Sequence, residues 1–143
     1  MKCPACRHEL SAVNTRGIIL DVCEGGCGGI WFDHFELQKF DEPHETIPED
    51  IAHPRFNPEA DVDPAPERRC PRCEGVVMLR FAVEGVRHAQ LDNCPSCGGY
   101  WLDAGELTLL RSQFKPKATR PPAPSPTAAQ ARASASILRL PRA

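Results

Sequence analysis

Eight cysteines are the residues of this 143-residue chain whose spacing points most directly to a chemistry. They fall into two sets of four, and each set consists of two closely spaced pairs. Four thiolates are a preferred ligand set for structural zinc, which they surround as a tetrahedron. The sequence therefore predicts two zinc ions, one held by Cys3, Cys6, Cys23 and Cys27 and the other by Cys70, Cys73, Cys94 and Cys97.

The spacing within each set fits this interpretation. A C-x-x-C segment makes a tight turn that directs both sulfurs at one ion, and loops of sixteen and twenty residues separate the two pairs of each set. The pair Cys23 and Cys27 departs from the pattern, because three residues lie between its cysteines. Two of these are glycines, which allow a looser turn; the alternative is that the first site binds zinc weakly or not at all.

Other uses of paired cysteines remain open from the residues alone. Disulfides are typical of exported proteins, but the N-terminus has no apolar run resembling a signal peptide and no stretch is apolar enough to span a membrane. We therefore expect a cytoplasmic protein with reduced thiols. Rubredoxin-like iron binding and thiol redox chemistry also use C-x-x-C turns, and they form the alternative from a different functional class.

One β-hairpin is predicted between the two cysteine pairs of each set, and it would bring these pairs together. Glycine in each predicted turn supplies the positive φ that tight hairpin turns require. The predicted strands are Ser11–Thr15 and Ile18–Val22 around Arg16-Gly17, and Val76–Phe81 and Val86–Leu91 around Glu84-Gly85.

A short helix should follow each hairpin. Asp33 and Asp103 each stand three residues before a glutamate, which is a spacing typical of a helix N-terminus where the aspartate caps backbone N–H groups. The apolar residues that we expect to face the ribbons are Leu37, Phe40, Leu107 and Leu110. The five histidines are not needed as ligands, and Trp31 and Trp101 are expected to pack rather than to stack on bases.

These elements predict a small, metal-stabilised, mostly β protein with two zinc ribbons. The ribbons are residues 1–40 and 68–114. Between them lies an acidic, proline-rich linker, 41–67, which has nine acidic residues and one basic residue, and a basic, disordered tail follows at 115–143. Such a chain buries too little apolar surface to fold without metal, so chelation should unfold it.

The repeated unit resembles the transcription factor IIB-type zinc-finger family. The resemblance rests on the segment from Cys94 to Leu107, C-P-S-C-G-G-Y-W-L-D-A-G-E-L, and on the C-P-R-C turn at Cys70. The first unit is similar but differs by the extra residue before Cys27. The resemblance implies two tandem zinc ribbons with four cysteine ligands each, and it leaves the purpose of the protein undefined.

The sequence favours a binding role over catalysis, because no open metal site, activated nucleophile or phosphate loop is recognisable. We expect a protein-interaction or adaptor module whose partner belongs to the transcription machinery. Nucleic-acid binding is the alternative, through the basic tail and a basic patch on the second ribbon. The residues of that predicted patch are Arg68, Arg69, Arg72, Arg80 and Arg87.

Overall fold

The computed structural model describes residues 1–40 and 46–113. The first hairpin, β1 (Ser11–Thr15) and β2 (Ile18–Val22), has the predicted bounds and register, with Thr15 opposite Ile18. Arg16 and Gly17 both have positive φ, 54° and 84°, as a two-residue hairpin turn requires. The predicted tail, 115–143, and linker residues 41–45 lie outside the described residues.

The second hairpin is shorter and begins later than predicted. It consists of β4 (Leu79–Ala82) and β5 (Gln90–Asn93), with Phe81 opposite Leu91. Residues 83–89 form a longer connection in which Val86 and Ala89 are buried. The valines that made 76–81 and 86–91 look like strands therefore serve partly as core residues of loops.

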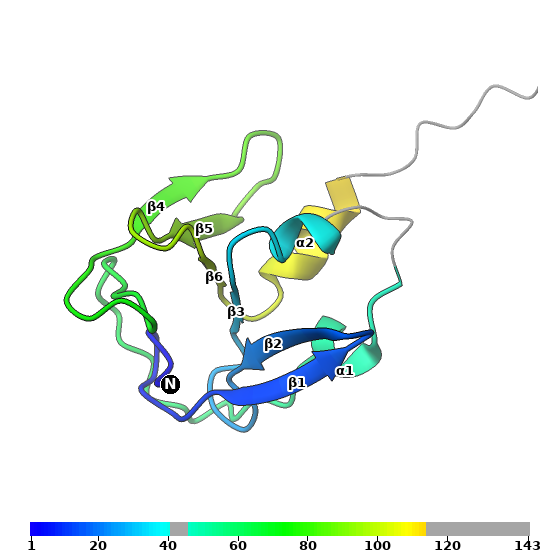
Figure 1. The fold of residues 1–143 in the computed structure, drawn as a ribbon, viewed down its shortest axis with the longest axis horizontal. Coiled ribbons are helices and arrows are strands. Elements are labelled where there is room, and N and C mark those ends of the chain that lie inside the picture. Colours follow the sequence, from blue (N-terminus) through cyan, green and yellow to red (C-terminus); the bar gives the residue numbers. More distant parts are fainter. Residues whose placement is uncertain (41–45, 114–143) are drawn as a thin grey trace, which may run out of the picture.

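A third strand in each unit joins the two ribbons. These strands, β3 (Ile30–Phe32) and β6 (Tyr100–Leu102), pair antiparallel, with Trp31 opposite Trp101. The result is one six-stranded sheet in the order β1-β2-β3-β6-β5-β4, which is symmetric about the β3–β6 pair (Figure 1). The predicted fold class is confirmed, but the prediction of a hairpin and a helix per unit missed this shared sheet.

Alternation along the strands divides the buried side chains between two cores. On one face, Ile30, Phe32 and Leu102 pack with residues of the helices. On the opposite face the two tryptophans pack with the cysteines of both sites. The helices are a 3₁₀ helix η1 (Leu37–Lys39), α1 (Glu49–Ala52) and α2 (Glu106–Gln113).

The helices after the ribbons confirm the predicted core positions. Leu37 and Phe40 are buried at η1, and Leu107 and Leu110 are buried on α2. The Arg111 side chain of α2 donates a hydrogen bond to the carbonyl oxygen of Phe40, which connects the ends of the two ribbons. None of the helices within 1–40 and 46–113 has the length and hydropathy needed to span a bilayer.

The described part of the linker is more than a connector. Ile51 on α1 is fully buried in the core shared with the sheet and α2. Further along, the Asp63 N–H donates to the carbonyl oxygen of Ala5, 2.8 Å away, inside the first cysteine turn. The chain between the ribbons therefore packs along the first ribbon before the second begins.

Candidate metal centres

The first centre brings together all four cysteines predicted for it. Cys3 and Cys6 come from the N-terminal turn, whereas Cys23 and Cys27 come from the turn after β2. The four Sγ atoms lie within 4.8 Å of one another, with 3.5 Å between Cys3 and Cys27 and 3.4 Å between Cys6 and Cys23. These separations are too long for a disulfide, whose sulfurs are about 2.05 Å apart.

The second centre is built in the same way. Cys70 and Cys73 precede β4, and Cys94 and Cys97 follow β5. The Sγ atoms of Cys70 and Cys97 are 3.8 Å apart. A zinc ion with bonds of about 2.3 Å to four sulfurs gives a tetrahedron with edges of about 3.8 Å. Both sets of sulfurs have the size and the number that such an ion requires.

Backbone amides support the sulfurs at the start of each turn. The N–H groups of Ala5 and Cys6 point at Sγ of Cys3, at 3.3 and 3.4 Å, and the N–H of Cys73 points at Sγ of Cys70, at 3.2 Å. Such bonds favour the thiolate over the thiol. These N–H groups therefore stabilise the negatively charged sulfurs that a metal ion requires.

The thiols of each centre shift one another's pKa values, because their sulfurs lie close together and share hydrogen bonds. In the first centre, hydrogen bonds from Cys27 and Cys3 lower the pKa of Cys23, while the hydrogen bond to Cys23 raises that of Cys3. In the second centre, burial opposes ionisation of Cys94, but hydrogen bonds from the backbone of Cys97 and Ser96, together with those of the Cys70 and Cys97 thiols, lower its pKa to about 7. Only a bound cation allows all four thiols to ionise together.

The longer turn between Cys23 and Cys27 is held by backbone hydrogen bonds to the linker. The N–H of Gly25 donates to the carbonyl oxygen of Arg55 at 2.8 Å, and the N–H of Asn57 donates to that of Gly26 at 2.7 Å. The longer turn thus pairs with the linker while still presenting both sulfurs. A side chain at Gly26 would meet Sγ of Cys23, so the turn requires glycine there.

The two aspartates after the tryptophans do not cap the helices as predicted. The indole Nε1–H of Trp31 donates to Asp33 at 3.0 Å, and that of Trp101 donates to Asp103 at 2.9 Å. Burying an indole N–H requires an acceptor, and this need takes the carboxylate away from the helix. The capping direction is reversed instead: the side chains of Glu36 and Glu106 accept from the N–H groups of Asp33 and Asp103, at 2.8 and 2.7 Å.

Both tryptophans are fully buried, in agreement with the expectation that they pack. Four of the histidines are described, and none of them belongs to either cysteine group: His8, His34, His53 and His88. Nδ1 of His34 lies 3.3 Å from the carbonyl oxygen of Gly98 in the other ribbon. His44 lies outside the described residues.

The predicted basic patch on the second ribbon is wrong for two of its five arginines. Arg68 is buried and donates to the carbonyl oxygens of Asp63 and Ala65 at 2.8 and 2.9 Å. Arg80 makes two hydrogen bonds, of 2.8 and 2.9 Å, to the buried carboxylate of Asp92. Arg68 and Arg80 thus form hydrogen bonds within the protein, whereas the sequence had suggested that they contact the phosphates of a nucleic acid.

Sequence reasoning also missed residues that join the ribbons. Gly29 and Gly99 each lie against the tryptophan of the other ribbon, and Arg72 forms an ion pair of 2.8 Å with Asp33. The repeated G-G-x-W pattern was the available signal for the glycine contacts, because each tryptophan needs a flat surface on which to pack. The ion pair of Arg72 with Asp33 could not be predicted from a local pattern, since these residues are far apart in sequence.

Comparison with known proteins identifies the repeated unit. The model of the transcription factor zinc-finger family matches residues 2–42 and again 69–112, which together are more than half of the chain. Searches of curated proteins and of solved structures gave no match. The donor set, its dimensions and the family agree on zinc, so the chain binds two zinc ions, one in each ribbon. The chain thus belongs to the transcription factor zinc-finger family, of which it contains two tandem copies.

Proposed function

We propose that this protein is a zinc-stabilised interaction module that binds a protein partner along the outer strand of its second ribbon. The observation that carries the proposal is the apolar surface of β4. Leu79 is 60% exposed and Phe81 is 43% exposed, although both are on the face of the sheet that is elsewhere covered by helices. Exposed apolar side chains that lie together favour a protein contact.

A groove of about 210 Å³ continues this surface across the boundary between the ribbons. His34 and Phe35 line it from the first ribbon, and Phe81, Leu91 and Tyr100 line it from the second. The rings of Phe81 and Tyr100 meet edge to face with their centroids 6.4 Å apart, and Phe35 is 60% exposed. The groove depends on the pairing of β3 with β6, so a single ribbon would not form it.

The position of β4 suggests the form of the partner. It is the last strand of the sheet, so its outer backbone groups have no neighbouring strand within the described chain. An extended peptide can add to such an edge through main-chain hydrogen bonds while its alternate side chains fill adjacent pockets. The proposed partner contributes an extended segment with apolar side chains at alternate positions, which contact Phe81 and the groove.

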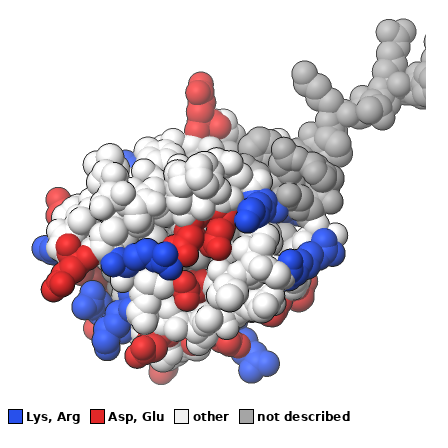
Figure 2. Space-filling model, viewed as in Figure 1, with Lys and Arg blue, Asp and Glu red and all other residues white. Residues whose placement is uncertain are grey.

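Other functions receive less support from the same structure. Four protein sulfurs complete each zinc site, which leaves no coordination position for a substrate. Both tryptophans are buried and thus offer no stacking surface to bases. The exposed rings of Phe35 and Phe81 line the apolar groove, whose described lining has no lysine or arginine to contact phosphates. Figure 2 shows basic and acidic side chains close together on the face in view, rather than one continuous basic surface. The family description makes the transcription machinery the first place to seek the partner.

The experiment is a pull-down with the zinc-loaded full chain, carried out on nuclease-treated lysate and read by quantitative mass spectrometry. The test variant is Phe81→Ser. The control is Ile19→Ser, because Ile19 is a similarly exposed strand residue (56%) of the other ribbon. We expect one protein to be retained by the wild type and by I19S but lost with F81S. Equal retention by F81S, or retention that depends on nucleic acid, would contradict the proposal.

A further inference from the structure

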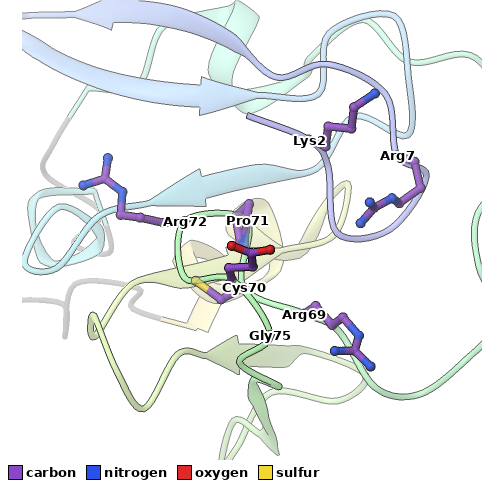
Figure 3. A pocket seen from close by; sticks show the side chains of 8 residues that line it. Lys2, Arg7, Arg69, Cys70, Pro71, Arg72 and Gly75 are labelled. Carbon is purple, nitrogen blue, oxygen red and sulfur yellow. The ribbon is translucent and has the colours of Figure 1, made fainter.

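A second surface lies between the two C-P-x-C turns, on the side of the zinc centres. It is a pocket of about 380 Å³ with four basic residues in its lining. Lys2 and Arg7 come from the turn of the first ribbon, and Arg69 and Arg72 come from that of the second (Figure 3). Lys2 and Arg69 each stand directly before the first cysteine of their ribbon, so the repeat itself places a cation on either side.

Of these four basic residues, Arg72 alone forms an ion pair within the described part of the chain. Arg72 is engaged by Asp33 of the first ribbon at 2.8 Å. Within the described part of the chain, no acidic side chain forms an ion pair with Lys2, Arg7 or Arg69. Among the described residues, Glu74 is the one acidic residue in this lining, and Asp63 and Glu67 line a second hollow that Arg7 and Arg69 share. Lys2, Arg7 and Arg69 thus line one pocket to which both ribbons contribute, and none of the three forms an ion pair with a described residue.

The chemistry of the lining identifies the class of ligand. Guanidinium groups bind carboxylates through paired hydrogen bonds, and Arg7 and Arg69 can act together on neighbouring carboxylates. Among the described residues the lining has no aromatic side chain on which a base could stack, which disfavours single-stranded nucleic acid. The pocket is also compact, whereas nucleic-acid binding uses a basic surface that follows the phosphate backbone.

We propose that this pocket binds an acidic segment, rich in aspartate or glutamate, of the protein partner. The inference rests on the proposed function and adds a second contact point to it. The apolar groove would hold the partner by burial, whereas the basic pocket would select it by charge. Electrostatic contacts of this kind act on specificity and on the rate of association.

A competing explanation is that the cations serve only to offset the charge of the zinc sites. Each site of four thiolates and one zinc ion carries a net charge of about −2, and Cys70 itself lines the pocket. In that case, replacing the cations would weaken zinc retention, and acidic peptides would not bind. The two explanations therefore differ in two separate measurements.

The test is a fluorescence anisotropy titration of the zinc-loaded full chain with a labelled hexaglutamate peptide. A labelled single-stranded oligothymidine serves as the competing probe. The test variant is Lys2→Glu with Arg69→Glu, and the control is Arg87→Glu, because Arg87 is exposed on the same ribbon but outside the pocket lining. Zinc content is measured for every variant.

We expect hexaglutamate to bind the wild type and R87E equally and the double variant about tenfold or more weakly, with zinc content unchanged. Affinity should also fall as salt rises from about 50 to 200 mM. Absence of peptide binding, tighter binding of the oligonucleotide, or zinc loss from the double variant would overturn the inference. Because the Phe81→Ser pull-down does not involve this pocket, failure here would leave the proposed function separately testable.

Discussion

Trp31 of the first ribbon lies directly against Gly99 of the second, so closely that a Cβ atom on the glycine would overlap with Cζ2 of the indole. Trp101 and Gly29 make the reciprocal contact. Each ribbon therefore completes its core with an aromatic ring from the other. This exchange, together with the β3–β6 pair, explains why two metal-binding units form a single sheet.

Gly99→Ala should destabilise the protein by about 3 kcal/mol, because the new Cβ atom would overlap with the fully buried indole of Trp31. The free energy of unfolding would be measured at fixed free zinc. Gly75→Ala is the control: Gly75 has a positive φ of 74° but open space around it, so its cost should be only about 1 kcal/mol. In a Trp31→Phe background the cost of G99A should shrink; an unchanged cost would show that the contact is not the cause.

Ile51→Ala should cost about 3 kcal/mol, although the residue lies in a segment whose composition is that of a linker. Its side chain is fully buried beside the sheet and α2. Denaturation at fixed free zinc would measure the loss, with Val62→Ala as the control because Val62 is a 43% exposed apolar residue of the same segment. Equal stabilities of I51A and V62A would mean that α1 does not pack on the ribbon.

This residue illustrates what the sequence could and could not predict. The cysteines, the first hairpin and the apolar residues after each Trp follow local patterns, and these were predicted correctly. Ile51 lies among prolines and acids, and its one i, i+4 partner, Ile47, makes too short a pattern to mark it as buried. The pairing of β3 with β6 was missed for a related reason, because three-residue strands are too short for alternation to be recognised.

The ion pairs of Arg80 with Asp92 and of Arg72 with Asp33 should differ in their contribution to stability. Arg80→Ala leaves the carboxylate of Asp92, which is 2% exposed, without its partner, and should cost about 2 kcal/mol or more. Arg72→Ala removes a pair whose side chains are 51% and 31% exposed, and should cost less than about 1 kcal/mol. Urea denaturation of both variants tests the order, and a larger loss for R72A would contradict it.

Glu106 should make stability depend on pH. Burial raises the pKa of its carboxyl to about 7, against the opposing effect of hydrogen bonds from the N–H groups of Gln90 and Asp103. The folded protein therefore holds a proton that the unfolded chain releases above its ordinary pKa of 4.5, so the contribution of Glu106 falls as pH rises through about 7. Acid also releases zinc from thiolates, which is why the comparison must be made with a variant.

The measurement is the difference in unfolding free energy between the wild type and Glu106→Gln, taken from pH 5 to 8 at fixed free zinc. The wild type should lose stability relative to E106Q as pH rises over this range. Glu36→Gln is the comparison: burial also raises the pKa of Glu36, but this carboxyl is less buried, so its pH dependence should have the same sign and be smaller. A difference that stays constant with pH would contradict the assignment to Glu106.

The central claim is that two four-cysteine sites, each filled by zinc, organise the two ribbons. Mass spectrometry of the full chain under native and then denaturing conditions, after purification without added metal, tests it most directly. We predict two zinc ions per chain in the native spectrum and eight reduced cysteines in the denatured one. A chain with a single zinc ion, with iron, or with disulfides in place of metal would contradict it.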